Sequence, residues 1–194
     1  MSLATAAPMP ESPADAELVA RVARGDLEAL GALFERYEPS IRSYLVRLGV
    51  VQGDVDDLVQ GTFLEVIRAA ERYDANHPVK TWLLGIATMM VRRHRRSAAR
   101  LAARLVAWSG LAEHAAPSGH ATPSELIEHD EAARRLSAAL NRLAPAKRAA
   151  FVLVTLEGLS GEAAARVLGV PVKTVWTRLH YARRELRAAL GGRS

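Results

Sequence analysis

Basic side chains interleaved with aromatic ones are concentrated near the C-terminus of this 194-residue chain. Residues 131–194 hold twelve Lys or Arg against four Asp or Glu, a net charge of +8, whereas the whole chain carries +5. Cationic groups at this density bind polyanions, because each contact with a phosphate releases counterions. The C-terminal third is therefore predicted to bind nucleic acid.

Residues 159–178 have the pattern of a helix-turn-helix. Ser160 suits the cap of the first helix, Gly169 the turn, and Pro171 the first turn of the second helix. The second helix is predicted to bury the stripe Val175, Leu179, Ala182 and Leu186. Its other sides are predicted to contact bases through Lys173, Trp176, Thr177 and His180, and phosphates through Arg178, Arg183, Arg184 and Arg187, with Thr174 and Tyr181 beside them. A helical hairpin with a merely solvated basic face is the alternative.

A second basic run ends a helix that is predicted to begin near Thr81. The loop of residues 73–80 precedes this helix and contains Asn and His side chains, which can pair with the edge of an extruded base. A single-stranded DNA site is therefore predicted, formed by Asn76, His77, Lys80, Trp82, Arg92, Arg93, Arg95 and Arg96. In the alternative interpretation, Trp82 belongs to the core and the arginines form an ordinary exposed helix end.

A further predicted helix, which contains residues 54–67, carries several carboxylates. They project from the side opposite an apolar stripe and form a surface that suits a basic protein partner: Asp54, Asp56, Asp57, Gln60 and Glu65, with Leu64 exposed nearby. Clustered carboxylates can also bind a divalent cation, and a nucleic-acid hydrolase built on Asp54, Asp56 and Asp57 is a further alternative. No catalytic base or nucleophile accompanies them, so we predict no catalytic residues, no metal site and no cofactor.

Apolar residues recur at three- and four-residue spacing along most of the chain, and strand-like alternation is absent. We therefore predict an all-α protein of two small helical domains, an N-terminal helical bundle over residues 17–100 and a C-terminal helix-turn-helix domain over residues 123–194. Residues 101–122 lose clear periodicity and contain Pro, Ser and Gly, which predicts a flexible linker. The Pro- and Ala-rich residues 1–16 are predicted to be a disordered tail.

The sequence contains no cysteine and no apolar run long enough to span a membrane, and its N-terminus lacks the basic region of a signal peptide. We expect a cytoplasmic protein without direct membrane insertion.

Five segments, taken together and in this order, resemble the extracytoplasmic-function (group 4) sigma factors of the sigma-70 family. They are residues 56–64, 81–87, 143–145 and 156–160 and the helix-turn-helix, and the resemblance extends over about residues 17–192. It implies a non-catalytic transcription initiation factor that binds the RNA polymerase core through the beta-prime clamp helices and the beta flap. The acidic surface would dock on the clamp helices, residues 74–96 would recognise and open the minus-10 element, and the helix from Val172 would read the minus-35 element. It also implies control by an anti-sigma factor.

Three positions depart from the pattern of that family. Gly61 stands where Glu is usual, which removes a charge from the docking surface and weakens the helix by about 1 kcal/mol relative to alanine, so reduced affinity for the polymerase core is expected. Ala164 replaces a large aliphatic residue and Trp176 a residue that is more often basic, so an unusual minus-35 preference is expected. A stand-alone helix-turn-helix regulator is the rival function, and it would require a ligand pocket or a phosphoacceptor in the N-terminal domain.

Overall fold

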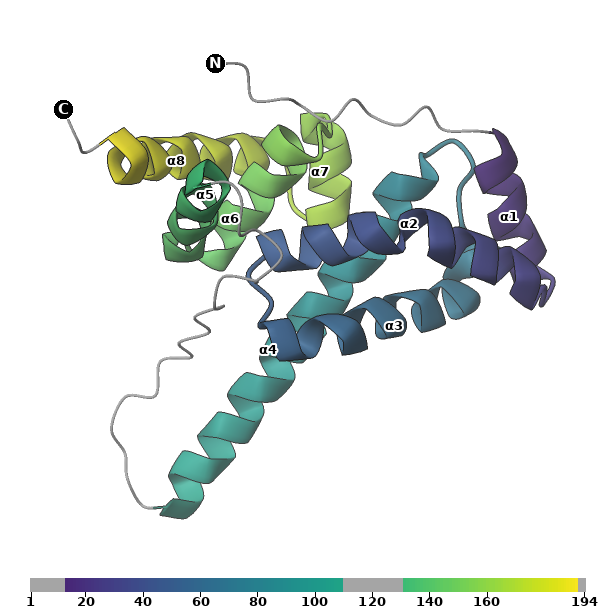
Figure 1. Cartoon of the computed structure of the whole chain (residues 1–194), viewed down its shortest axis with the longest axis horizontal. Helices are drawn as coiled ribbons and strands as arrows, with labels where there is room; N and C mark the ends of the chain where they lie inside the picture. The colour runs from purple at the N-terminus through teal and green to yellow at the C-terminus, as the bar shows by residue number, and fades with distance from the viewer. Residues whose placement is uncertain (1–12, 110–130, 192–194) are drawn as a thin grey trace.

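The structure is a computed structural model that describes residues 13–109 and 131–191, and every regular element in these two ranges is helical (Figure 1). The helices are α1 (Pro13–Ala23), α2 (Leu27–Arg47), α3 (Gln52–Ala69), η1 (Ala70–Arg72), α4 (Val79–Ser109), α5 (Glu131–Arg142), α6 (Pro145–Phe151), η3 (Val152–Leu156), α7 (Gly161–Leu168) and α8 (Val172–Gly191). The predicted all-α fold with an N-terminal bundle and a C-terminal helix-turn-helix is confirmed. None of the described helices is long and apolar enough to cross a membrane.

Helices α1 to α4 form the first bundle around one apolar stripe from each helix. Asp26 caps α2, because its carboxylate accepts hydrogen bonds from the backbone N–H groups of Glu28 and Ala29 at 2.9 and 3.1 Å. The N–H of Ala29 and the guanidinium of Arg21 hold the pKa of the Asp26 carboxyl below its usual value. The α2 stripe then enters the core through Leu33, Ile41, Tyr44 and Leu45, each with no exposed surface.

Tyr44 places a polar group in the middle of this core. Its hydroxyl lies 2.7 Å from the Thr88 hydroxyl, which in turn donates to the Leu84 carbonyl at 2.7 Å. Tyr44 is therefore the donor to Thr88, and the small polar network is satisfied. Burial raises the pKa of the Tyr44 phenol above its ordinary value.

Helices α5 to α8 form the second domain, and its helix-turn-helix follows the predicted geometry. The Ser160 hydroxyl accepts a hydrogen bond from the Ala163 N–H at 3.1 Å and caps α7. Gly169 ends α7 in the left-handed conformation with φ of 63°, which a residue with a Cβ rarely adopts. The predicted α8 stripe Val175, Leu179, Ala182 and Leu186 is buried.

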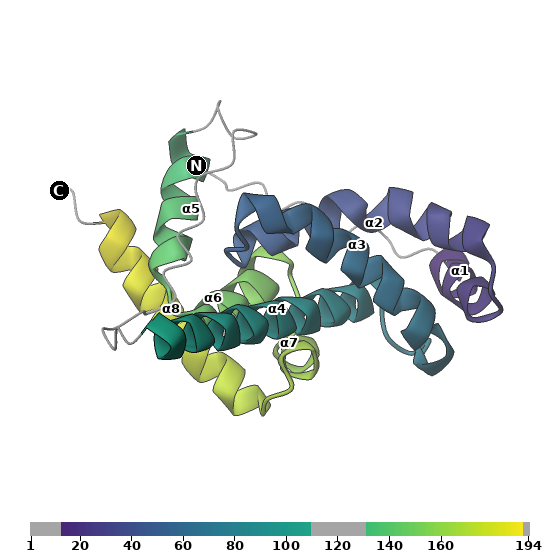
Figure 2. The same cartoon turned by 90° about the horizontal axis from the view of Figure 1, so that it is seen from below.

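The two domains pack against each other, and α7 lies beside α4 (Figures 1 and 2). One buried apolar cluster runs from Val19 in α1 to Val175 in α8. Polar contacts close its edge, since the Glu157 carboxylate pairs with Arg47 of α2 at 2.9 Å and with Lys80 of α4 at 3.0 Å. The described form of the protein is therefore a closed one.

Two segments that the sequence analysis placed outside the domains are helical. Residues 13–16, assigned to the tail, begin α1, and the buried Asp15 accepts a hydrogen bond from the Tyr37 hydroxyl at 2.7 Å and pairs with Arg36. Residues 101–109, assigned to the linker, continue α4. Residues 1–12 and 110–130, which include the rest of the predicted tail and linker, lie outside the described residues.

Replacing Tyr44 with Phe tests the buried network. We expect Tyr44→Phe to lower the free energy of unfolding by about 1 kcal/mol at pH 7, because one buried hydrogen bond is lost. In the wild type the folded-state pKa is raised, so the stability held by the neutral phenol is fully present below pH of about 10 and is lost as pH rises further. The difference between the two proteins in urea unfolding should therefore shrink above pH of about 10. A difference that stays constant with pH would contradict this account.

Candidate nucleic-acid and protein interfaces

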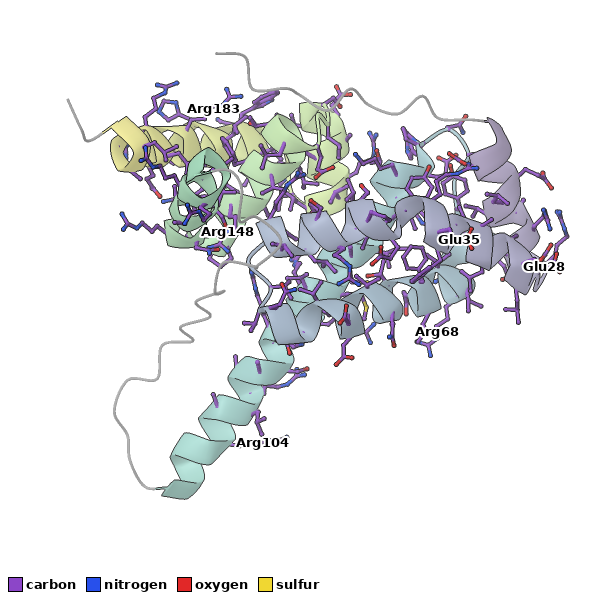
Figure 3. The ribbon with its side chains drawn as sticks, viewed as in Figure 1. Glu28, Glu35, Arg68, Arg104, Arg148 and Arg183 are labelled. Carbon is purple, nitrogen blue, oxygen red and sulfur yellow. The ribbon has the colours of Figure 1, made fainter. Side chains whose placement is uncertain are left out.

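The face of α8 opposite its buried stripe is basic and exposed (Figure 3, near Arg183). The exposed members of the predicted set are Lys173, Trp176, Thr177, His180, Tyr181, Arg183, Arg184 and Arg187, while Thr174 and Arg178 are half-buried. The structure thus brings the predicted residues together on one helix with eight of them exposed, and the Thr177 hydroxyl donates to the Lys173 carbonyl of the same helix at 3.0 Å.

Tyr181 organises the cations on this face. Its ring lies 4.9 Å from the Arg184 guanidinium and 5.8 Å from the Lys147 ammonium, and the His180 ring meets it edge-on at 5.5 Å. Lys147 also pairs with Glu185 at 2.6 Å. The aromatic ring therefore restricts where the Arg184 guanidinium can point.

Trp176 serves the fold as well as the exposed face. Its side chain is 49% exposed, yet a Cβ added to Gly161 would lie 2.5 Å from the indole Cζ2. The glycine at the first position of α7 thus makes room for the indole of α8. Trp176 links the two helices of the helix-turn-helix while keeping half of its surface available.

The loop of residues 73–78 is held in shape by its own polar groups. The Asp74 carboxylate accepts hydrogen bonds from the backbone N–H and the side-chain amide of Asn76 at 2.9 and 2.8 Å, and the backbone bond holds the pKa of Asp74 below its usual value. The Tyr73 hydroxyl donates to the His77 carbonyl at 2.6 Å, and its ring lies 5.0 Å from that of Trp82. Trp82 is half-buried against the core, which fits the structural alternative for this residue.

The predicted single-strand site divides into residues used by the fold and residues left exposed. Arg92 donates to the Leu168 carbonyl at 3.1 Å and Arg95 to the Leu48 carbonyl at 2.6 Å, and Lys80 pairs with Glu157. Arg93, Arg96 and Asn76 are exposed, and the hydrogen bonds of Arg96 and Asn76 are local, to the Arg92 carbonyl and to Asp74. Sequence reasoning treated the four arginines alike, because a run of one residue type does not show which members meet a tertiary partner.

The acidic surface on α3 also divides. Asp57, Gln60 and Leu64 are exposed and lie one turn apart on the helix. The other three carboxylates are paired: Asp54 lies 3.1 Å from His94 of α4, Asp56 pairs with Arg42 of α2 at 2.6 Å, and Glu65 pairs with Arg68 at 3.3 Å. Asp54 and Asp56 thus turn toward different helices, and no group of three metal-binding side chains occurs in the described ranges.

Gly61 of α3 faces Met90 of α4, a contact that the sequence did not reveal. A Cβ at this position would lie 2.8 Å from the terminal methyl group of Met90. A side chain at this position would have to displace the flexible end of the Met90 side chain.

Sequence reasoning missed two buried charges that join the domains. The Glu157 side chain is only 4% exposed between Arg47 and Lys80. Arg148 is 5% exposed and donates to the carbonyls of Leu48 and Leu143 at 3.2 and 3.5 Å. Burial, with a smaller contribution from Arg95, lowers the pKa of Arg148 to about 10. The sequence pattern does not distinguish either residue from the exposed charged residues near it, such as Arg142.

Gly49 gives a direct test of the Arg148 contact. Gly49 has φ of 76°, and a Cβ there would lie 1.5 Å from the Arg148 guanidinium, so Gly49→Ala must displace this buried cation. Gly25 has φ of 89° with nothing within 4 Å, so Gly25→Ala carries only the conformational cost of about 1 kcal/mol. In denaturant unfolding we expect Gly49→Ala to lose at least 2 kcal/mol more than Gly25→Ala, the cost of an unsatisfied buried charge. Equal losses would show that Arg148 does not occupy this place.

Comparison with protein families matches two segments of the chain, Sigma-70 region 2 over residues 33–107 and Sigma-70, region 4 over residues 133–186. RNA polymerase sigma factor CnrH of Cupriavidus metallidurans is 32% identical over 181 residues, which cover 91% of this chain and 94% of that protein. The ECF RNA polymerase sigma-E factor of Haemophilus influenzae is 30% identical over 179 residues, which cover 90% and 94% of the two chains.

Among solved structures, CnrH in complex with the cytosolic domain of CnrY resembles this fold with a TM-score of 0.65 and 30% identity, covering 93% of this chain and 99% of that one. The family segments match the α2–α4 and α5–α8 parts of the structure, where the acidic surface and the helix-turn-helix lie. The rival interpretation as a stand-alone regulator is not favoured, because region 2 occupies the place of a sensory domain. The chain belongs to the extracytoplasmic-function group of the sigma-70 family, the non-enzymatic initiation factors that bind RNA polymerase and direct it to promoters.

Proposed function

We propose that this sigma factor docks on the polymerase core through α3 and places promoter DNA against α4 and α8. The observation that carries the proposal is the separation of two exposed surfaces of opposite charge, the row Asp57, Gln60 and Leu64 on α3 and the basic face of α8. Carboxylates next to a DNA-binding surface would repel the phosphates. The acidic row lies instead on α3, away from the basic face of α8, and such a surface suits a basic protein partner. In this assignment α1 to α4 form the region 2 domain and α5 to α8 the region 4 domain.

The polymerase contact centres on Asp57. Its carboxylate is exposed and forms no ion pair with any described residue, so docking on basic residues of the beta-prime clamp helices costs no existing bond. Leu64, 59% exposed two turns further, adds apolar area to the same row. Asp54, Asp56 and Glu65 would exchange their present partners for those of the polymerase. A contact of the region 4 domain with the beta flap completes the proposed interface.

Promoter recognition uses both domains. On α8, Lys173, Trp176, Thr177 and His180 are proposed to read minus-35 bases, and the surrounding arginines to hold phosphates. In region 2, Asn76 and His77 are proposed to pair with an extruded minus-10 base, and Arg93 and Arg96 to hold the strand. Lys80 and Arg92 can join them only when Glu157 and the Leu168 carbonyl release these side chains, so these two residues are proposed to reach the minus-10 strand only after the closed packing opens.

Regulation by an anti-sigma factor is the remaining part of the proposal. The similar CnrH structure is a complex with the cytosolic domain of CnrY. By analogy, this chain is proposed to be held by such a partner in the cytoplasm, where it meets RNA polymerase.

Run-off transcription with purified core polymerase tests the docking surface. On a pool of genomic promoter fragments the wild type should yield new transcripts, and Asp57→Arg should reduce them at least tenfold, because the reversed charge repels the basic partner. Glu28→Arg, the same reversal at the far end of α2 (Figure 3), is the matched control and should keep wild-type activity. Equal activity of the two variants would move docking away from α3.

DNA binding tests the division of roles on α8. For Arg184→Ala we expect weaker binding to all duplexes and a salt-dependence slope smaller by about 0.9, the value of one phosphate contact. For Thr177→Val we expect an unchanged slope and an altered preference among minus-35 sequences, because a base-reading hydroxyl is lost. Fluorescence anisotropy with a set of duplexes between 50 and 200 mM salt measures both. Unchanged preference in Thr177→Val would place base reading on other residues.

A further inference from the structure

Two exposed apolar side chains lie on the otherwise polar DNA face of α8. Trp176 is 49% exposed, and Val172, one turn earlier on the same side of the helix, is 37% exposed. Their exposed neighbours on this face, Lys173, Thr177 and His180, are polar or basic. The surface assigned to the DNA bases therefore has an apolar part as well as a polar one.

The indole of Trp176 is held in place by α7, which packs against α8 (Figure 1). A Cβ on Gly161 would lie 2.5 Å from Cζ2, 2.8 Å from Cε2 and 3.1 Å from Nε1 of the indole, so the glycine leaves the room that this side of the ring occupies. Nε1 is the one polar atom of the side chain, and the remaining ring atoms are carbon. The indole also forms one wall of an open surface hollow, with Leu179, His180 and Arg183 among its neighbours. Trp176 thus offers an apolar surface to a ligand, in a position that the contact with Gly161 restricts.

The major groove of a DNA duplex contains one apolar group, the 5-methyl group of thymine. The faces of the bases are stacked in the duplex, so an aromatic side chain in the groove meets the edges of the bases. The other groups on these edges are hydrogen-bond donors and acceptors, and an apolar ring would remove their water without replacing its hydrogen bonds. A tryptophan on the reading face of α8 therefore favours a T·A pair over a pair that lacks the methyl group.

We propose that Trp176, assisted by Val172, recognises the methyl group of a thymine in the minus-35 element, and that Gly161 is the positioning residue for this contact. The inference rests on the proposed function, in which α8 reads minus-35 bases, and it names the group that one of its residues reads. A basic side chain, which is more usual at this place in the family, would instead favour a guanine edge or a phosphate. The tryptophan therefore changes which base pair is preferred.

Removal of single methyl groups from the DNA tests the contact. Holoenzyme formed from core polymerase and the full chain is bound to a promoter that run-off transcription identifies. Each thymine of the minus-35 element is replaced in turn by deoxyuridine, which lacks the methyl group and keeps the pairing edge. For the wild type we expect one replacement to weaken binding about fourfold, the effect of one buried methyl group. Trp176→Phe should keep this loss because the ring stays apolar, whereas Trp176→Lys should bind both forms of the promoter equally.

Leu190→Lys is the matched control, because it makes the same change at another exposed apolar residue, in the last turn of α8. This variant should show the wild-type loss. Gly161→Ala should remove most of the loss, since its Cβ displaces the indole, while Gly53→Ala, with nothing within 4 Å, should keep it. Gly161→Ala added to Trp176→Lys should leave the ratio of the two affinities unchanged, as expected of a residue that acts through Trp176.

The outcomes separate this inference from the function on which it rests. Wild-type binding that no deoxyuridine weakens, or a loss that persists in Trp176→Lys, would overturn the methyl contact. An undiminished loss in Gly161→Ala would overturn the positioning role. Wild-type holoenzyme that shows no preference among minus-35 sequences would refute the proposed function of α8, and the inference with it.

Discussion

The carbonyl oxygen of Leu48, at the end of α2, is the point on which the closed structure depends. It accepts hydrogen bonds from Arg95 of α4 at 2.6 Å and from Arg148 of α6 at 3.2 Å. The C-terminal end of a helix carries partial negative charge, so two cations can share it. Burial lowers the pKa of both guanidiniums, which measures the cost of removing them from water. The hydrogen bonds to the Leu48 carbonyl offset that cost, and they join the bundle to the helix-turn-helix domain.

The charged groups of the described residues are of two kinds, those paired within the protein and those left unpaired at the surface. Charges that hold the fold are paired, as Asp15 is with Arg36 and Glu157 is with Arg47 and Lys80. On the surfaces assigned to partners some charges lack an ion pair with any described residue, as with Asp57 on α3 and Arg93 on α4, whereas Asp56 and Lys80 are paired. Exposed, unpaired charges cost no existing bond when a ligand binds, whereas paired ones must first be released. The closed form therefore leaves α8 ready for duplex DNA and holds part of the minus-10 site in intramolecular bonds.

Local chemistry made much of this predictable from the sequence. The Ser160 cap, the left-handed Gly169 and the buried stripe from Val175 to Leu186 each depend on residues within a few positions, and each was predicted correctly. The difference between Arg92 and Arg93 depends on which side of α4 meets α7, which no local pattern encodes. The same applies to the contact between Gly61 of α3 and Met90 of α4. The helical residues 13–16 and 101–109 show that Pro- and Ala-rich composition is a weak guide to where a helix begins or ends.

The two bonds to the Leu48 carbonyl also differ in how far along the chain their donors lie. Arg95 follows Leu48 by 47 residues, whereas Arg148 follows it by 100. A ribosome therefore delivers the first donor, together with all of α1 to α3, well before the second exists. Since domains generally fold as units from the N-terminus during synthesis, we expect the bundle to form with the Arg95 bond in place and the second domain to pack against it later.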